Sequence, residues 1–183
     1  MFRGTVIAQV IAVIVGIYLA KLYGEEAYGY LGFFISVTSI ASIIGTLQLN
    51  NCIITSKSKK QSSNWFSFIL VLIPISTIIF FILFFIFSRF IVIEKLNNSI
   101  FNLSFIGSIF ITYNLVHQNC FTYTKKFNVI SNTKIFITIC SVFFQFILYK
   151  YYNILGLIYG FLIAQILLLC FNFYKNKNSI HSI

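Results

Sequence analysis

Long uncharged runs separated by short charged segments constrain this chain more than any other feature. Residues 61–88 and 96–124 contain no charged side chain, and 59% of the chain is hydrophobic while only 9% is charged. Soluble domains carry about 25% charged residues, and a hydrocarbon core of roughly 30 Å requires about 20 apolar residues per helix. The runs lack the alternation typical of transmembrane strands. The sequence therefore predicts an all-α polytopic membrane protein.

Six transmembrane helices are predicted, and together they form a single membrane domain over residues 1–183. The longest connection, at 50–64, is too short to bury a core of its own, so no soluble domain is expected. Pro74 lies inside the third helix and predicts a kink, which neighbouring helices can tolerate by satisfying the freed carbonyl. The predicted helices are about 4–20, 27–49, 65–88, 98–121, 128–149 and 151–174.

The connecting segments differ in charge when they are assigned alternately to the two sides of the membrane. The side with both termini carries nine basic residues: Arg3, Lys57, Lys59, Lys60, Lys125, Lys126, Lys134, Lys175 and Lys177. The other side carries four basic residues and all three acids: Lys21, Arg89, Lys95, Lys150, Glu25, Glu26 and Glu94. Because lysine and arginine are retained on the cytoplasmic side, both termini are predicted to be cytoplasmic. This topological origin of the positive charge gives no indication of nucleic-acid binding.

Catalytic and metal-binding patterns are missing from the sequence. No pair of carboxylates lies within a predicted helix, so general acid–base chemistry has no embedded carrier. The four cysteines have none of the short spacings of a zinc or redox site; they are Cys52, Cys120, Cys140 and Cys170. We therefore expect neither an enzyme nor a bound metal or cofactor.

A few polar side chains within the predicted helices have two interpretations. Gln9 lies in an otherwise apolar helix, and Lys134 is the one charged residue inside a predicted helix. An intramembrane cation is a functional-site hypothesis by default, although Lys134 could also snorkel to the cytoplasmic interface. The uncharged groups either line a hydrated cavity or form interhelical hydrogen bonds of about 0.6–2 kcal/mol. The others include Ser36, Thr38, Ser39, Ser42, Asn114, His117, Gln118, Asn119, Gln145 and Gln165.

Small residues recur at four-residue spacing in the first and last predicted helices. Such residues fall near one line of a helix and allow another backbone to approach closely. We therefore expect close helix packing at Gly4, Ala8, Ala12, Gly16 and Ala20, and at Gly156 and Gly160.

Several short segments resemble bacterial polysaccharide flippases, which belong to the superfamily of the multidrug and toxic compound extruders. Residues 21–34, Lys-Leu-Tyr-Gly-Glu-Glu-Ala-Tyr-Gly-Tyr-Leu-Gly-Phe-Phe, resemble the first periplasmic loop and second helix of these proteins. The segment Gly-Thr-Val-Ile-Ala-Gln at 4–9 is similar to the start of their first helix. Residues 121–134 look like their basic fourth loop, and Gly-Leu-Ile-Tyr-Gly at 156–160 is similar to part of their sixth helix.

The resemblance implies an N-terminal six-helix lobe of a two-lobe flippase in the bacterial inner membrane, which the chain would supply as a truncated or split product. Such proteins move undecaprenyl-diphosphate-linked oligosaccharides for O-antigen or capsule synthesis. The implied partners are this lipid-linked oligosaccharide, membrane lipids, and a second six-helix lobe or a homodimer partner. Gln9 and Lys134 are expected to face the cargo cavity, with Lys21 at its periplasmic mouth.

One departure from the family pattern bears on whether the chain can work alone. The family commonly has an arginine and a glutamate at the cytoplasmic end of the second helix, where this chain reads Gln48-Leu-Asn50. A multidrug or cation-coupled exporter of the same fold and a non-transporting orphan lobe are alternative interpretations. Such an exporter usually has an ion-binding acid in a helix, and no Asp or Glu lies inside a predicted helix here.

The charge asymmetry makes a prediction about topology. The segments 50–64 and 122–133 should be cytoplasmic, and 21–27, 89–97 and the region near 150 periplasmic. In a chain whose native cysteines are replaced, a membrane-impermeant thiol reagent added from outside should label Glu25→Cys and spare Lys59→Cys. The opposite labelling pattern would overturn the predicted topology.

Overall fold

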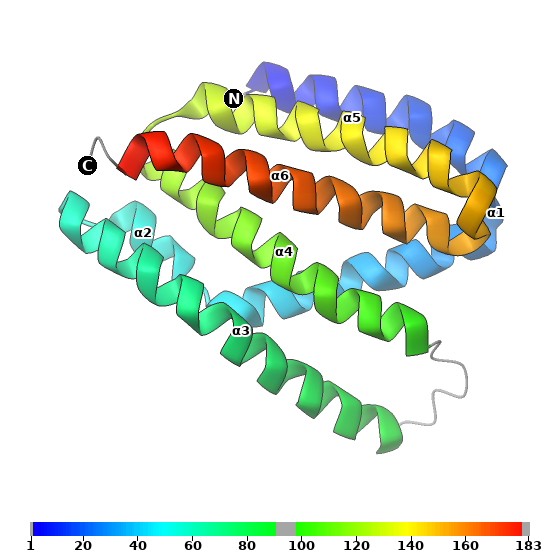
Figure 1. The fold of residues 1–183 in the computed structure, drawn as a ribbon, viewed down its shortest axis with the longest axis horizontal. Coiled ribbons are helices and arrows are strands. Elements are labelled where there is room, and N and C mark those ends of the chain that lie inside the picture. Colours follow the sequence, from blue (N-terminus) through cyan, green and yellow to red (C-terminus); the bar gives the residue numbers. More distant parts are fainter. Residues whose placement is uncertain (1, 91–97, 181–183) are drawn as a thin grey trace. The chain divides into compact units, whose positions relative to one another are not determined.

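The computed structural model describes the backbone of residues 2–90 and 98–180, and the side chains of residues 4–86 and 99–176. Over these residues the chain is helical and contains no strand, which confirms the all-α prediction (Figure 1). The predicted connection at 89–97 falls mostly outside this range, as do Glu94, Lys95 and the side chains of Arg3, Arg89 and Lys177. The elements are α1 (Phe2–Thr46), α2 (Asn50–Thr55), α3 (Lys59–Phe90), α4 (Asn98–Tyr123), α5 (Phe127–Tyr152), the 3-10 turn η1 (Asn153–Leu155) and α6 (Gly156–Ile180).

Four stretches of the described chain are long and apolar enough to cross a membrane. They contain 43, 28, 25 and 50 residues and are Gly4–Thr46, Lys59–Ile86, Ser99–Tyr123 and Phe127–Asn176. One crossing takes about 20 residues, so the first and last stretches are each about twice that length. The chain is a membrane protein, with four such stretches where the sequence predicted six separate helices.

The chain divides into two compact units. Unit 1 comprises Met1–Phe33 and Phe121–Ser182, and unit 2 comprises Phe34–Cys120. Unit 1 therefore contains the first part of α1 together with α5, η1 and α6. Unit 2 contains the last part of α1, then α2, α3 and most of α4. The single membrane domain expected from the sequence stays a prediction.

In unit 1, α1 is broken at one residue, Gly24. Its backbone has φ 80° and ψ 170°, a conformation essentially restricted to glycine. The chain folds back on itself there, and this brings the Tyr28 hydroxyl to the carbonyl of Gly16, to which it donates a hydrogen bond at 3.0 Å. Residues from both sides of Gly24 share one apolar cluster, consisting of Leu19, Tyr23, Ala27 and Leu157, with Val15, Tyr28, Leu31 and Ile154 around it.

The predicted connection at 21–27 contains the break at Gly24, but the break is narrower than predicted, since helix continues to either side of Gly24. Hydropathy excluded this segment from both flanking helices because it is charged. Lysine, glutamate and alanine are nevertheless good helix formers, so the charged residues are compatible with helix on either side of the break at Gly24.

Three other predicted boundaries also differ. The second predicted helix ends at Thr46 rather than 49, in a turn where Leu47 and Gln48 have positive φ values of 47° and 55°. The predicted connection at 50–64 holds α2 and the first turn of α3. The last helix begins at Gly156 rather than 151, after η1. At 50–64 polar residues were assigned to a connection although they form helix, whereas at the other two boundaries mainly apolar residues were assigned to a helix that does not include them.

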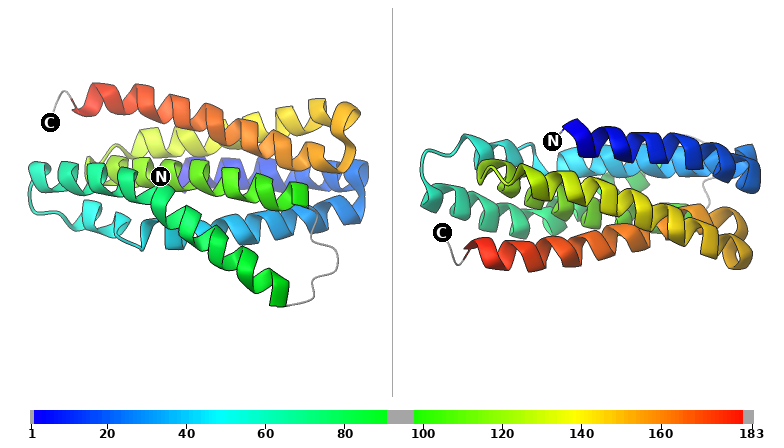
Figure 2. Two further views of the ribbon diagram at one scale, coloured as in Figure 1. Left: turned by 60° about the horizontal axis from the view of Figure 1, so that its bottom comes forward. Right: turned by 90° about the horizontal axis from the view of Figure 1, so that it is seen from above.

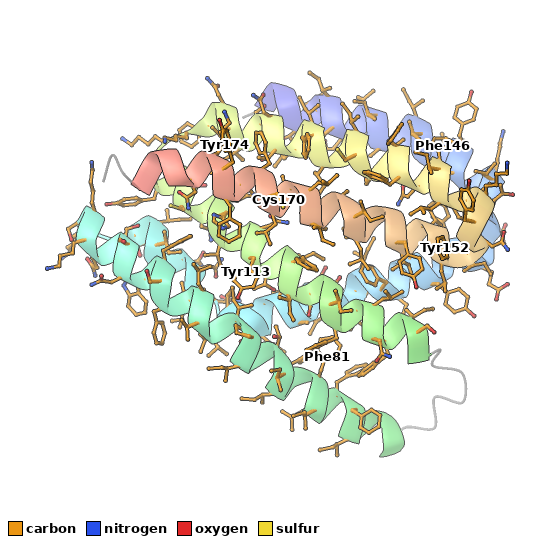
Figure 3. The ribbon with its side chains drawn as sticks, in the orientation of Figure 1. Phe81, Tyr113, Phe146, Tyr152, Cys170 and Tyr174 are labelled. Carbon is orange, nitrogen blue, oxygen red and sulfur yellow. The ribbon has the colours of Figure 1, made fainter. Side chains whose placement is uncertain are left out.

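In unit 2, a side chain of α4 compensates for the proline in α3. Pro74 has no backbone N–H, so the carbonyl of Leu70, four residues earlier, loses its helical partner. The Tyr113 hydroxyl donates to that carbonyl at 3.1 Å (Figure 3). Figure 2 shows that α3 is bent along its length. The prediction that a neighbouring helix satisfies the carbonyl freed by Pro74 is confirmed.

Aromatic side chains join α3 to α4 beyond the bend. The ring of Phe81 (Figure 3) meets Phe101 and Phe105 edge-on, with ring centroids 5.3 and 5.0 Å apart. Phe84 stacks on Phe101 at 5.6 Å. Such pairs contribute about 0.5–1.5 kcal/mol beyond their buried area, so the two helices are held together on both sides of Pro74.

The pairing of Pro74 with Tyr113 predicts a specific energetic coupling. Tyr113→Phe should destabilise the protein by about 1–2 kcal/mol, because the Leu70 carbonyl is left without a donor in an apolar environment. In a Pro74→Ala background the backbone N–H returns, and the same substitution should cost much less. Unfolding in detergent measures both effects, with the exposed Tyr174→Phe as control. An equal loss in the two backgrounds would contradict this pairing.

Candidate functional site

Five polar side chains form a stripe along α5. They occur at alternating spacings of three and four residues, so they lie on one face of the helix. We call this set the α5 polar stripe; it consists of Ser131, Lys134, Thr138, Ser141 and Gln145. Around it α5 is mainly apolar, so the stripe is a line of polar groups within a stretch that is able to cross a membrane.

Lys134 is the charged member of the stripe. Its side chain is half-buried, and its ammonium group donates a hydrogen bond to the hydroxyl of Thr5 on α1 at 3.2 Å. The described acids, Glu25 and Glu26, are both exposed. They lie roughly 30 Å of helix further along α1 than Thr5. Within the described side chains Lys134 thus has a hydroxyl partner and no carboxylate. Its charge is not neutralised locally, which is costly in an apolar span.

Thr5, the hydrogen-bond partner of Lys134, lies one helical turn from Gln9. Gln9 is exposed and lies four residues after Thr5, so these two side chains share one face of α1. Lys21 is also exposed, but it is about 18 Å of helix further along from Gln9. Of the three predicted cargo residues, two therefore lie at the same end of unit 1, and Lys21 lies apart. Their roles in binding stay predictions.

The opposite end of the stripe is closed by hydrogen bonds. The Tyr23 hydroxyl donates to the backbone carbonyl of Gln145 at 2.5 Å. The Gln145 amide, which is 7% exposed, donates to the carbonyl of Leu157 on α6 at 3.1 Å. The ring of Tyr23 meets Tyr149 edge-on at 4.9 Å. Gln145 is thus an interhelical hydrogen-bonding group that joins α1, α5 and α6.

Small residues allow these helices to approach closely at particular points. A Cβ atom at Gly4 would lie within 3 Å of Ser131, and one at Gly160 would lie 2.6 Å from the backbone nitrogen of Gln145. A Cβ at Gly156 would lie 2.7 Å from the Tyr23 hydroxyl oxygen. Figure 1 shows α5 and α6 side by side and antiparallel, as these contacts require.

The rest of the small-residue line on α1 behaves differently. Ala8 is buried, whereas Ala12 and Ala20 are exposed. Around Gly16 no heavy atom comes within 4 Å of the position of a Cβ. The close packing expected at Gly16 is therefore not present within this chain. Equal spacing places these residues on one line, but of its two glycines only Gly4 lies close to a residue of α5, Ser131.

Sequence reasoning missed most of the stripe. It identified Lys134 and Gln145 but not Ser131, Thr138 or Ser141, although their spacing is visible in the sequence. The partners on α1, Thr5 and Tyr23, could not be found in this way because nothing local links them to α5. They become site residues only when α1 lies beside α5.

Several polar groups of unit 2 have a structural explanation. Ser104, Ser108 and Thr112 are fully buried on α4, and their hydroxyls donate to carbonyls of the same helix at 2.5–2.8 Å. The Asn119 amide donates to the carbonyl of Asn50 at 3.3 Å. No group of residues suited to hold a metal ion occurs in the described part of the chain. The α5 polar stripe with Lys134 is therefore the stronger candidate site.

Comparison with known proteins identifies one family. A family model described as polysaccharide biosynthesis protein matches residues 18–181. No curated protein and no solved structure matches the sequence.

The glycine contacts predict opposite responses to the same substitution. Gly160→Ala should destabilise the protein by about 1–3 kcal/mol, because the new methyl group would collide with the backbone of Gln145. Gly16→Ala has open space and should be neutral or stabilise by up to about 1 kcal/mol through helix propensity. Thermal unfolding of the purified variants in detergent measures the difference. Equal stability of the two variants would show that Gly160 is not a packing contact.

Proposed function

This chain belongs to the polysaccharide biosynthesis protein family, and on that premise we propose that it contributes one lobe of a flippase. Its cargo is an undecaprenyl-diphosphate-linked oligosaccharide, which it translocates across the bacterial inner membrane for O-antigen or capsule synthesis. The observation that carries this proposal is Lys134: a half-buried cation in an apolar span, on a polar stripe, with a hydroxyl as its hydrogen-bond partner.

The chemistry of the cargo calls for such a residue. A diphosphate and a glycan cannot enter hydrocarbon without polar partners, whereas the prenyl chain can remain in the bilayer. Lys134 attracts the diphosphate, with an attraction of about 4 kcal/mol for a unit charge at about 4 Å and an effective dielectric constant of about 20. Gln9 hydrogen-bonds the head or the first sugar. Lys21 acts as a weaker electrostatic contact at the periplasmic mouth.

The proposed lobe crosses the membrane six times. Two features support this number: the break at Gly24 divides the 43-residue stretch, and η1 divides the 50-residue stretch. Each half is close to the length of one crossing. An even number of crossings puts both termini on one side, and the distribution of lysine and arginine favours the cytoplasm.

A second lobe is required for transport in this proposal. A cavity that opens alternately to the two faces needs two opposing walls, and six helices supply one of them. A second lobe in tandem would enter the membrane in the same orientation. Two copies of this chain could also supply both walls, related by a twofold axis along the membrane normal.

Expression of the 183-residue chain in a strain that lacks its own O-antigen flippase tests the requirement for a second lobe. We expect no surface polysaccharide from the chain alone, and restoration when a second lobe is co-expressed. Restoration by the chain alone would refute the single-lobe argument and favour the homodimer. Membrane insertion, measured in parallel, separates a failure to transport from a failure to fold.

Variants of Lys134 test its contact with the cargo in whichever assembly restores transport. Hydrogen bonds to charged groups contribute about 1.5–3 kcal/mol, so Lys134→Ala should reduce surface polysaccharide about tenfold or more. Lys134→Arg keeps the charge and should retain most of the activity. Lys150→Ala is the matched control, because Lys150 is an exposed lysine of the same helix. Undiminished transport by Lys134→Ala would show that this lysine only snorkels to the interface.

A further inference from the structure

An exposed cluster of positive charge lies at the start of α3, in unit 2. Lys57, Lys59 and Lys60 are all exposed, and no acidic residue occurs anywhere between residues 27 and 93. No acid lies in the first turn of α3. Because the N-terminus of a helix carries a partial positive charge, lysines in its first turn are unfavourable unless an anion is nearby. The lysine cluster therefore lacks a compensating anion within its own part of the sequence.

Hydrogen bonds order the backbone that carries these lysines. The backbone N–H of Gln61 donates to the Ser58 hydroxyl, and the Gln61 side-chain oxygen accepts from the backbone N–H of Lys57, both at 3.2 Å. This arrangement closely resembles a capping box. The Ser62 hydroxyl, which is buried, donates to the carbonyl of Ile53 at 3.4 Å and ties α3 to α2. The lysine cluster thus projects from an ordered turn.

An apolar groove begins one to two helical turns beyond the lysines. It has a volume of about 420 Å³ and is lined by Leu49, Asn64, Trp65 and Phe68. Trp65 and Phe68 form an edge-to-face pair at 6.0 Å. The groove is shallow, open to the surroundings and mostly apolar.

The order of side chains along α3 matches the order of groups in a phospholipid. Lys60, Asn64 and Phe68 are four residues apart and follow one face of the helix. Each is about 6 Å further into the apolar stretch than the one before. Along this face a cation is followed by an amide and then by an aromatic ring, as a phosphate is followed by a glycerol ester and an acyl chain.

We propose that this surface binds an anionic glycerophospholipid of the bilayer. The lysine cluster contacts the phosphate and its anionic headgroup, the Asn64 amide donates to an ester carbonyl, and one acyl chain occupies the groove beside Trp65 and Phe68. Clusters of basic residues next to membrane helices are recognised by anionic lipids in this way. The proposal does not rest on the transport function, since it uses no residue of the α5 polar stripe.

Trp65 provides a direct probe, because it is the single tryptophan of the chain. The full chain is reconstituted in vesicles of phosphatidylcholine and phosphatidylglycerol, and one lipid at a time carries brominated acyl chains that quench tryptophan fluorescence on contact. We expect Trp65 to be quenched preferentially by brominated phosphatidylglycerol, with a relative binding constant of about five or more, the factor that one lysine near an anionic surface contributes. Equal quenching by the two lipids would mean that Trp65 meets only bulk lipid, and would overturn the proposal.

Matched variants test whether the lysine cluster causes the preference for phosphatidylglycerol. The variant K57Q/K59Q/K60Q should lose the preference, whereas K57R/K59R/K60R should keep it. K125Q/K150Q/K175Q removes the same charge from three exposed lysines of unit 1 and should also keep it. A preference that persists in K57Q/K59Q/K60Q would refute the site. The preference could also be lost in sodium phosphate but kept in sodium chloride of equal ionic strength. That result would show that the lysines bind soluble phosphate, and it would also refute the lipid site.

Discussion

The constraint on which the whole structure depends is that a polar group in hydrocarbon must find its partner within the protein. The backbone meets this requirement by forming helices. Serine and threonine side chains meet it by donating to carbonyls three or four residues earlier, as Thr38, Thr77 and Thr133 do. Where a helix loses a bond of its own at Pro74, a hydroxyl from the next helix replaces it. Many of the polar side chains in the apolar stretches are therefore satisfied by the helices themselves.

Lys134 stands out against this background. A lysine ammonium has three donors and a full charge, and the contact described for it is a single hydroxyl, that of Thr5. Thr138 and Ser141 of the same stripe donate to their own helix, to the carbonyls of Lys134 and Thr138, both at 2.9 Å. Its own helix thus satisfies these hydroxyls, and α6 satisfies the Gln145 amide, but neither supplies a counter-charge for Lys134. This difference is why Lys134, rather than the more numerous uncharged groups, supports a role in binding an anionic cargo.

The same constraint explains why charged residues gather in the α2–α3 connection, at the start of an apolar helix. Lys57, Lys59 and Lys60 are exposed and gathered where an apolar helix begins, so their charges remain in the polar layer while α3 continues into hydrocarbon. The turn at Leu47 and Gln48 has positive φ angles, which cost non-glycine residues about 1 kcal/mol or more each. That turn directs the chain into α2 and places Leu49 in the groove beside Trp65. Charge and backbone geometry together give this end of unit 2 a defined surface.

The sequence by itself determined the class of the protein, because charge and apolarity summed over about 20 residues are enough to predict membrane helices. It also predicted the kink at Pro74, a consequence of the missing N–H alone. It placed the break between the first two helices within 21–27, but it did not predict that helix continues up to Gly24 from either side, since the charges that mark a polar segment are compatible with a helix. The sequence also provided no way to tell that Gly160 packs closely against the Gln145 backbone, whereas Gly16 has no atom within 4 Å of where its Cβ would lie. Only the tertiary structure decided that Thr5 meets Lys134 and Tyr23 meets Gln145, because these contacts depend on which helix faces lie side by side, and residue spacing within one helix carries no information about that.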